Sequence, residues 1–480
     1  MPVDTLDQKM TKRGLKLRGF QKIGIEWLAA RDRALLCDEM GTGKTCQALL
    51  ALPEENRARS EKAPPVLVIC PANAKHVWAQ KEGPKWRPDL KPFILEGEGS
   101  FRWPAVGEML VTNYDVLPDP GDVHQAPPTG CIIVADEAHY LKNPRARRTV
   151  RFKALAEKAR YDKGRTWLLT GTPLLSHPLD LWSLASCAGL AQEHFGLLKS
   201  FKELFGGVVT KKHACRQCGH KEPAKEGSDK CPKRIGKKAC SCDAHVTETE
   251  EWGQPSAEVR ERFAKFALRR LRSEVLPELP GKTYEDVPVV LSAQASEAID
   301  EELVDDWEAA LTEALDTQGG VSFTELASAR RAIAEAKIPA MLEIVEEYEE
   351  QDTPLVVFSA HRAPLDHFLE REGWGVITGD TPSKTRSQIE TDFQAGKLKG
   401  VAANIKAGGT AITLTYGSNM LFVDREYNPG DNLQAEDRCV RLGQESAVLI
   451  KRLIADHRLD QRLAEILDTK TKMIVDSLGK

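Results

Sequence analysis

The chain has 480 residues, of which 41% are hydrophobic and 29% charged, and its formal net charge is −4 at pH 7. That length accommodates about two to four domains with large cores, and the charge excludes a global basic field, so any nucleic-acid surface must be local. With no apolar run of about 18 residues and no signal-peptide core, we expect a soluble protein that is not secreted and has no membrane partner, cytoplasmic or, in a eukaryote, nuclear.

Five short apolar runs in the first 170 residues are typical of strands buried on both faces. Each run ends in polar residues, and helical or loop segments separate the runs. This alternation predicts a parallel α/β sheet whose ligands bind at the carboxyl ends of the strands. The runs are residues 34–37, 66–70, 109–112, 131–135 and 167–169.

The first run leads into the segment DEMGTGKT, which has the pattern of a phosphate-binding loop before a helix. Small residues at Gly41 and Gly43 let backbone N–H groups surround phosphate oxygens, Lys44 can reach the β- and γ-phosphates, and Thr45 can bind Mg²⁺. Asp38 stands where the pattern GxxxxGK[ST] has its first glycine, so an ordinary tight turn remains the alternative.

Two further polar features fit a nucleotide site. The fourth run continues into DEAH, in which Asp136 can hold Mg²⁺ directly or through water and Glu137 can orient the attacking water. A surface acidic pair is the alternative, but the phosphate loop upstream favours the functional interpretation. Gln21, at the start of a helical pattern, offers an amide to an adenine edge, although such glutamines are more often surface residues.

The eleven cysteines form two groups. Six occur singly in apolar stretches, which predicts small buried residues in a reducing compartment. They are Cys37, Cys46, Cys70, Cys131, Cys187 and Cys439.

The other five cysteines crowd into one short polar segment, where Cys215-x2-Cys218 followed by glycine is typical of a zinc knuckle. So short a segment cannot bury a core, which favours a structural Zn²⁺ over a disordered loop, and a disulfide framework does not fit a chain without a secretory signal. Residues 211–243 carry ten Lys or Arg against four Asp or Glu, so they either contact phosphates or form a solvated face. The expected ligands are Cys215, Cys218, Cys240 and Cys242, with Cys231 as the alternate, and His213, His220 or His245 could substitute.

The second half repeats the α/β pattern. A Pro-rich crossing at residues 276–282 is interpreted as a hinge, and residues 297–316 form an acidic helical pattern with no Lys or Arg. Apolar runs then predict a second sheet. In QAEDRCVRLGQ, Arg438 and Arg441 lie three apart on one helix face, where they can act as arginine fingers on a γ-phosphate or, alternatively, form surface ion pairs. The runs are residues 355–358, 376–377, 400–403 and 420–423.

The ordered motifs resemble those of superfamily two helicases, and specifically the Swi/Snf-type DNA-dependent ATPases. They are LRGFQKIGIEWL, DEMGTGKT, VADEAH with YLKNP, LTGTP with LDLWSL, FALRRLRSEVLPELPGK, FSAH, TGDT, AGGTAITLT and QAEDRCVRLGQ. The resemblance extends from about residue 17 to 472 with an interruption at the cysteine cluster, and it is closest to small annealing-helicase or fork-remodelling members and their bacterial and phage relatives. Thr42 replaces the usual leucine and Val440 a common histidine, and neither change removes a phosphate ligand.

The resemblance implies two RecA-like α/β lobes with ATP between them and double-stranded DNA across them. Lobe 1 is expected at residues 1–280, with the zinc insert at about 211–246. Lobe 2 is expected at residues 281–480, with an acidic helical insert at about 295–350. The implied cofactors are ATP and Mg²⁺ beside the structural Zn²⁺, and replication, recombination or transcription proteins are candidate partners.

The resemblance also implies roles for single residues. Lys44, Asp136, Glu137, Arg438 and Arg441 are expected to be catalytic, and Thr45 and Asp136 to bind Mg²⁺. The expected ATP-binding residues are Gln21, Gly41, Thr42, Gly43, Lys44 and Thr45. The expected DNA-contacting or coupling residues are Asn113, Thr170, Gly171, Thr172, His361, Thr413 and Gln434.

The function expected from these features is that of an ATP-hydrolysing motor that moves on double-stranded DNA and remodels DNA or protein–DNA complexes. One alternative is a helicase that separates DNA or RNA strands, because DEAH also occurs in such proteins. An alternative of another class is a zinc-dependent DNA-binding scaffold with a vestigial ATPase.

Overall fold

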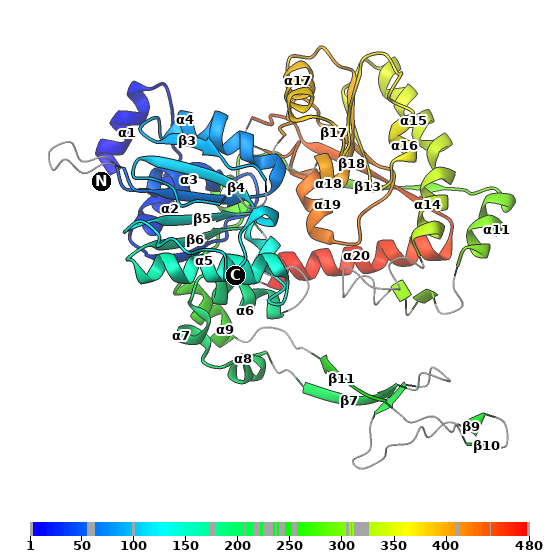
Figure 1. Cartoon of the computed structure of the whole chain (residues 1–480). Coiled ribbons are helices and arrows are strands. Elements are labelled where there is room, and N and C mark those ends of the chain that lie inside the picture. The colour runs from blue at the N-terminus through cyan, green and yellow to red at the C-terminus, as the bar shows by residue number, and fades with distance from the viewer. Residues whose placement is uncertain are drawn as a thin grey trace.

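Two lobes lie side by side in the computed structural model of the chain (Figure 1). Among the described helices, none combines the length and apolar character needed to cross a membrane. The structure describes residues 3–54, 63–97, 101–171, 178–205, 208–214, 221–223, 234–235, 238–239, 245–251, 257–303, 307–308, 310–311, 326–408, 412–441 and 443–477.

The first lobe contains a seven-stranded sheet in the order β12-β1-β6-β5-β2-β4-β3, and every neighbouring pair is parallel. All five apolar runs predicted as strands lie in this sheet. The strands are β1 (Arg33–Leu36), β2 (Val66–Cys70), β3 (Lys91–Ile94), β4 (Glu108–Asn113), β5 (Ile132–Asp136), β6 (Arg165–Leu169) and β12 (Ala267–Leu268).

Side chains of the first sheet alternate between two cores, one on each face. Ala34 and Leu36 pack into the core that includes α2 (Gly19–Ala29) and α3 (Lys44–Ala51), whereas Leu35 and Cys37 pack into the core with α5 and α6. Burial on both faces explains the continuous apolar strands. The other helices of this lobe are α1 (Val3–Lys12), a π-helix (Val77–Glu82), α4 (Gly83–Trp86), α5 (Arg147–Tyr161), α6 (Pro178–Cys187), α7 (Ala191–Phe195), α8 (Leu198–Leu204) and α9 (Ala257–Ala264).

The second lobe contains a six-stranded parallel sheet in the order β13-β18-β17-β14-β16-β15. Its strands are β13 (Lys282–Val289), β14 (Leu355–Ser359), β15 (Trp374–Ile377), β16 (Gly400–Asn404), β17 (Asn419–Phe422) and β18 (Val448–Ala455). Its helices are α11 (Ala293–Glu301), α14 (Ala327–Ala336), α15 (Ile338–Glu350), α16 (Ala363–Asp366), α17 (Ser383–Gln394), α18 (Ile405–Gly408), α19 (Pro429–Glu436) and α20 (Arg458–Ser477). The predicted α/β fold with two parallel-sheet lobes is therefore confirmed.

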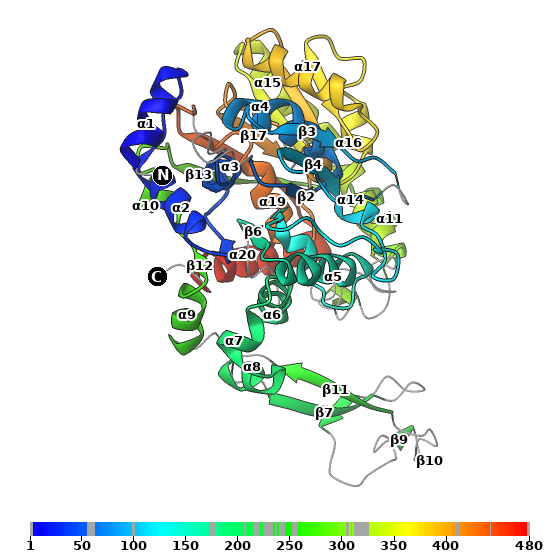
Figure 2. The same cartoon turned by 60° about the vertical axis from the view of Figure 1, so that its left-hand side comes forward.

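Neither β13 nor β18 was among the strands predicted from apolar runs. β13 is an edge strand whose residues are mostly exposed, and β18 interrupts its apolar residues with Lys451 and Arg452. The segment between β12 and β13 contains α10 (Arg272–Val275) and the Pro-rich crossing interpreted as a hinge. In Figure 2, α9, β12, α10 and β13 follow one another along one side of the molecule, so this segment connects the lobes.

The two cysteine predictions have different outcomes. All six singly placed cysteines are buried and free, as predicted. The five clustered cysteines lie outside the described residues, between β7 (Val208–Ala214) and β11 (His245–Glu251), which pair antiparallel. Within the described part of the chain, no group of three or more His, Cys, Asp or Glu side chains could hold a metal ion.

Candidate functional site

The loop between β1 and α3 has the backbone of a phosphate cradle. Gly41 and Gly43 have φ of 79° and 78°, in the left-handed region that glycine adopts without steric cost, and Gly43 is the N-cap of α3. A side chain at Gly43 would lie 2.7 Å from Nε2 of Gln21. Because the first N–H groups of a helix have no intrahelical acceptor, the start of α3 offers them to an anion.

Lys44 folds back over this loop. Its Nζ donates to the backbone carbonyls of Asp38 and Glu39, at 2.9 and 3.3 Å. A Cβ on Gly171, at the end of β6, would lie 2.6 Å from Cγ of Met40 and 3.5 Å from this Nζ. Glycine at position 171 thus lets a second loop approach the lysine, because a side chain there would clash with Met40.

The contacts of Asp38 explain why an aspartate stands where the phosphate-loop pattern has a glycine. The side chain is fully buried, and its two carboxylate oxygens accept hydrogen bonds from Nε and Nη2 of Arg270, the first at 2.9 Å. Gln47 of α3 donates to Asp38 at 3.3 Å and accepts from Arg270 at 2.9 Å. The carboxylate therefore ties the phosphate loop and α3 to the segment that leaves the first lobe.

Asp38→Asn is expected to lower the free energy of unfolding by about 3–5 kcal/mol, because it leaves the guanidinium of Arg270 without its carboxylate in a largely buried site. Urea denaturation followed by tryptophan fluorescence measures this loss. Asp366→Asn, which removes an exposed ion pair with Arg362, is the control and is expected to change little. Equal, small effects for both variants would contradict the structural role of Asp38.

The acidic pair after β5 is buried and asymmetric. Asp136 accepts from Nε1 of Trp78 at 2.7 Å and from the backbone N of Glu137 at 3.1 Å. Burial, and then the charge of Glu137, raise the pKa of Asp136 to about 6. Burial also acts to raise the pKa of Glu137, but His139, 3.3 Å away, and Lys44 hold it below its ordinary value. Glu137 is thus the carboxylate that stays ionised.

Glu137 is held in place by both lobes. Its φ of 50° is in the left-handed region, which is uncommon for a residue with a side chain. From the second lobe, Nε2 of Gln434 donates to its Oε1 at 3.3 Å. The unusual backbone and this contact aim the carboxylate at the space between the lobes.

Arg438 and Arg441 come after the end of α19 at Glu436, so the prediction that they share one helix face is wrong, but both are buried in the same region. Nε of Arg438 donates to the carbonyl of Gln434 at 3.1 Å, and Nη1 of Arg441 donates to the carbonyl of Ile412 at 3.1 Å and to Oγ1 of Thr413 at 3.3 Å. Nε of Arg441 is buried without a hydrogen-bond partner. Burial, and then the charge of Arg441, lower the pKa of Arg438 to about 9, although Glu137 and Asp437 act in the opposite direction.

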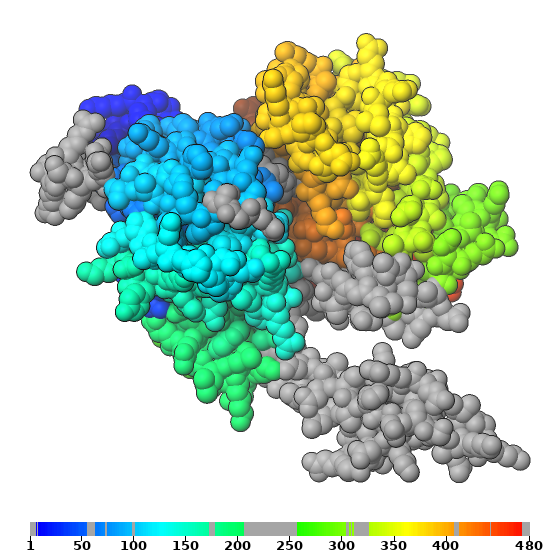
Figure 3. All heavy atoms as spheres, in the orientation of Figure 1, coloured from blue at the N-terminus to red at the C-terminus, as the bar shows by residue number. Residues whose placement is uncertain are grey.

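One cavity of about 360 Å³ brings most of the predicted residues together. Residues of both lobes line it, and Figure 3 shows the furrow along which the two lobes meet. The first lobe contributes the phosphate loop and the acidic pair, and the second lobe contributes the two arginines. The predicted residues that line the cavity are Gln21, Gly41, Gly43, Lys44, Thr45, Asp136, Glu137, Thr413, Gln434, Arg438 and Arg441.

Other predicted residues lie elsewhere. Thr42 is buried within the loop, with its hydroxyl on the carbonyl of Glu39, and Thr170 is buried at the end of β6. Asn113 is buried at the end of β4 and does not line the cavity, and His361 contacts Asp424 in the second lobe. Thr172 is outside the described residues. Gln21 uses its amide on the backbone of Arg18 and Thr42.

ATP with Mg²⁺ fits these residues. Two buried guanidiniums and Lys44 face a cavity in which the orphaned Nε of Arg441 needs an acceptor, and a polyphosphate supplies several. Asp136 and the hydroxyl of Thr45 are oxygen ligands of the kind that Mg²⁺ prefers. A bound Mg²⁺ would reverse the raised pKa of Asp136, because its charge favours the ionised carboxylate.

Sequence reasoning did not identify two contributors to this site. Trp78, on the π-helix, lines the cavity and donates to Asp136, and Arg270 anchors the loop through Asp38. The tryptophan in VWAQKE and the arginine in FALRR were visible as residue types, but only contacts across 58 and 232 positions assign them to the site.

Two family models together match most of the chain. The SNF2-related domain matches residues 20–334, and the helicase conserved C-terminal domain matches residues 336–443. A solved structure, the Sulfolobus solfataricus SWI2/SNF2 ATPase core in complex with dsDNA, is similar with a TM-score of 0.41 and 22% identity, covering 97% of this chain and 93% of that chain.

Three curated relatives illustrate the similarity. The chain is 29% identical to the SWI/SNF-related matrix-associated actin-dependent regulator of chromatin subfamily A-like protein 1 of Xenopus tropicalis, over 99% of this chain and 46% of that protein. It is 26% identical to human DNA annealing helicase and endonuclease ZRANB3, over 97% and 40%. An uncharacterized ATP-dependent helicase of Mycoplasma pneumoniae is also 26% identical, over 97% and 42%. The chain thus spans less than half the length of these relatives.

Proposed function

The chain belongs to the SNF2-related family, and from this premise we propose that it is an ATP-hydrolysing motor that translocates on double-stranded DNA and remodels DNA or protein–DNA complexes. The observation that carries the proposal is the shared cavity. Lys44 and Glu137 enter it from the first lobe, and Arg438 and Arg441 enter it from the second. A site divided in this way links hydrolysis to the relative position of the lobes, which a motor requires.

Each residue has a role in this mechanism. Lys44 and the N–H groups at the start of α3 bind phosphate oxygens, and Asp136 with Thr45 would hold Mg²⁺, which would supply positive charge to offset that of the phosphates. Glu137 stays ionised and orients the attacking water. Arg438 and Arg441 stabilise the charge that develops in the transition state.

The domain boundaries belong to the same proposal. Lobe 1 comprises residues 1–280 and lobe 2 residues 281–480, and the start of β13 at Lys282 supports this division. We assign the coupling of ATP hydrolysis to DNA binding to the predicted set of residues that includes Thr170 and Gly171. The closeness of Gly171 to Nζ of Lys44 supports this assignment.

The cysteine-rich segment is proposed to bind one structural Zn²⁺ through the cysteines predicted above, and its basic composition favours a DNA phosphate contact. This part of the proposal rests on the sequence. Elemental analysis of the purified chain is expected to find about one zinc per chain, which is lost when Cys215 and Cys218 are both changed to serine.

DNA as the track is supported by the relatives named DNA annealing helicases. The test is ATP hydrolysis measured with duplex DNA, single-stranded DNA, forked DNA and RNA, together with displacement of a triplex-forming strand. Duplex DNA is expected to stimulate hydrolysis most and to support displacement without separation of its own strands. The Lys44→Ala chain is the control for contaminating ATPases.

Other outcomes would favour the alternatives. Separation of a labelled duplex, with stimulation by single strands or RNA, would favour a strand-separating helicase, whose DEAH motif this chain shares. DNA binding without hydrolysis on any effector would favour a zinc-dependent scaffold. The complete charged set in the cavity argues against that last possibility.

A further inference from the structure

The segment between the lobes carries cations whose side chains turn back toward both lobes. Arg272 begins α10 and is 9% exposed. Its backbone N donates to Oε2 of Glu39 at 2.7 Å, and its Nη2 lies 3.3 Å from Oε1 of the same residue. Glu39 follows Asp38 in the phosphate loop, so Arg272 is attached at this end to the nucleotide-binding lobe.

The other side of the same guanidinium holds the segment that carries the arginine fingers. Nη1 of Arg272 donates to Oδ1 of Asp437 and to the backbone carbonyl of Val440, both at 2.8 Å. Asp437 directly precedes Arg438, and Val440 directly precedes Arg441. The side chain of Arg272 therefore contacts the residue directly before each of the two proposed arginine fingers.

A second cation reinforces this connection. Nζ of Lys282, the first residue of β13, donates to Glu436 at 2.9 Å and to Asp437 at 3.0 Å, and the hydroxyl of Tyr284 donates to Glu436 at 2.8 Å. Burial acts to raise the pKa of Asp437, but Lys282 and Arg272 hold it below its ordinary value. Asp437 is thus an ionised acceptor shared by two cations.

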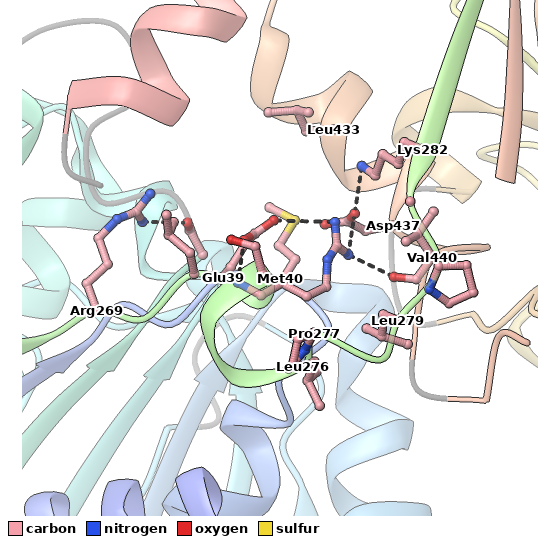
Figure 4. Close-up of a pocket in the computed structure, with 16 residues that line it drawn as sticks. Glu39, Met40, Arg269, Leu276, Pro277, Leu279, Lys282, Leu433, Asp437 and Val440 are labelled. Carbon is pink, nitrogen blue, oxygen red and sulfur yellow. Dashed lines mark hydrogen bonds and ion pairs between the residues drawn. The ribbon is translucent and has the colours of Figure 1, made fainter. Parts of the chain in front are cut away.

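These contacts lie outside the nucleotide cavity. A separate pocket of about 440 Å³, shown in Figure 4, is surrounded by Glu39, Lys282, Asp437 and Val440, and Arg272 lines it without lining the cavity that contains Lys44. The two loops also approach closely, since a Cβ added at Gly41 would lie 3.7 Å from the carbonyl of Val440 and 3.9 Å from Cγ of Arg441. Arg272 therefore contacts these two loops from the side of the second pocket, outside the nucleotide cavity.

We propose that Arg272 is a positioning residue for hydrolysis, which joins Glu39 of the phosphate loop to Asp437 and Val440 and so sets where Arg438 and Arg441 stand relative to the phosphates. The role rests on the proposed ATPase function. Without this contact the fingers lose their register with Lys44, while the phosphate-binding groups of the first lobe stay in place. A displacement of about 1 Å at such a site can reduce the rate ~10²-fold.

The test is steady-state ATPase of Arg272→Ala on saturating duplex DNA. We expect kcat to fall ~10²-fold while KM for ATP stays nearly unchanged, because the lost interaction is made in the transition state. Arg272→Lys is expected to recover part of kcat, since an ammonium can reach Asp437 but lacks the planar fork that also meets Glu39 and Val440. Arg272→Ala combined with Arg438→Ala is expected to be slower than Arg438→Ala alone by less than the ~10²-fold effect of the single variant, because only Arg441 is left to be displaced.

Two controls keep the test specific. Arg371→Ala removes a two-bond contact with Glu349 elsewhere in the second lobe and is expected to leave kcat unchanged. Should Arg272→Ala not fold, Asp437→Asn removes the negative charge that Arg272 pairs with in the second lobe and is expected to lower kcat in the same direction. A wild-type kcat in a folded variant, or effects of Arg272 and Arg438 that multiply, would overturn the proposal.

A second measurement does not depend on ATPase activity. In hydrogen exchange, the amides of residues 436–441 are expected to exchange at least about tenfold faster in Arg272→Ala than in the unchanged chain, a shift that corresponds to 1.4 kcal/mol in the opening equilibrium. Absence of DNA-stimulated hydrolysis in the unchanged chain would defeat the proposed function alone. Unchanged exchange in these residues would defeat the positioning role alone.

Discussion

Arg438→Ala is expected to lower DNA-stimulated kcat by ~10³–10⁵-fold, the range that arginine fingers contribute to phosphoryl transfer. The side chain is buried at the shared cavity, and burial together with the positive charge of Arg441 lowers its pKa to about 9. A phosphoryl group that gains negative charge in the transition state would be stabilised by these two neighbouring positive charges. Removal of the arginine therefore costs most at the transition state and little in the ground state.

Single-turnover hydrolysis measures this effect on the chemical step. Arg438→Lys is expected to recover only part of the rate, because a point charge cannot reproduce the guanidinium fork. Thermal unfolding serves as the control and is expected to change little, since the alanine relieves repulsion between two buried cations. A kcat within a few-fold of the unchanged chain would show that this residue is not a finger.

Lys44→Ala and Glu137→Gln are expected to abolish DNA-stimulated ATP hydrolysis, each by at least ~10²–10³-fold, the loss that follows removal of one preorganised electrostatic contact. Lys44 already folds over the phosphate loop at hydrogen-bond distance from two carbonyls, a position from which it can transfer to phosphate oxygens. Glu137 stays ionised at neutral pH, and glutamine removes the charge while keeping the shape.

The two variants should differ in binding. Lys44→Ala is expected to weaken nucleotide binding, whereas Glu137→Gln is expected to bind ATP without turnover, and both should keep measurable DNA binding. Fluorescent-nucleotide titration and filter binding of duplex DNA separate these properties. Substantial turnover in either variant would contradict the mechanism, and loss of DNA binding in both would indicate misfolding instead.

Local patterns were sufficient where burial decides the structure. The apolar runs that become β1, β2, β4, β5 and β6 are covered on both faces, so their composition alone predicts them. The edge strand β13 defeats this reasoning, because its side chains are mostly exposed and its pairing with β18 comes from residues about 166 positions away. Such long-range pairing produces no recognisable pattern of apolar residues in the sequence of either segment.

The sequence by itself determined the chemistry available to this protein: a glycine-rich loop with Lys44, an acidic pair, two arginines three residues apart, and the motif order that marks its family. Only the tertiary structure decided how these groups meet. It paired Asp38 with Arg270 and Arg272 with Asp437, and it placed Arg438 and Arg441 beside the cavity that Lys44 also lines. The reason is physical: a motif specifies residue types over a few positions, whereas a charge gains its role from partners that folding brings together across hundreds.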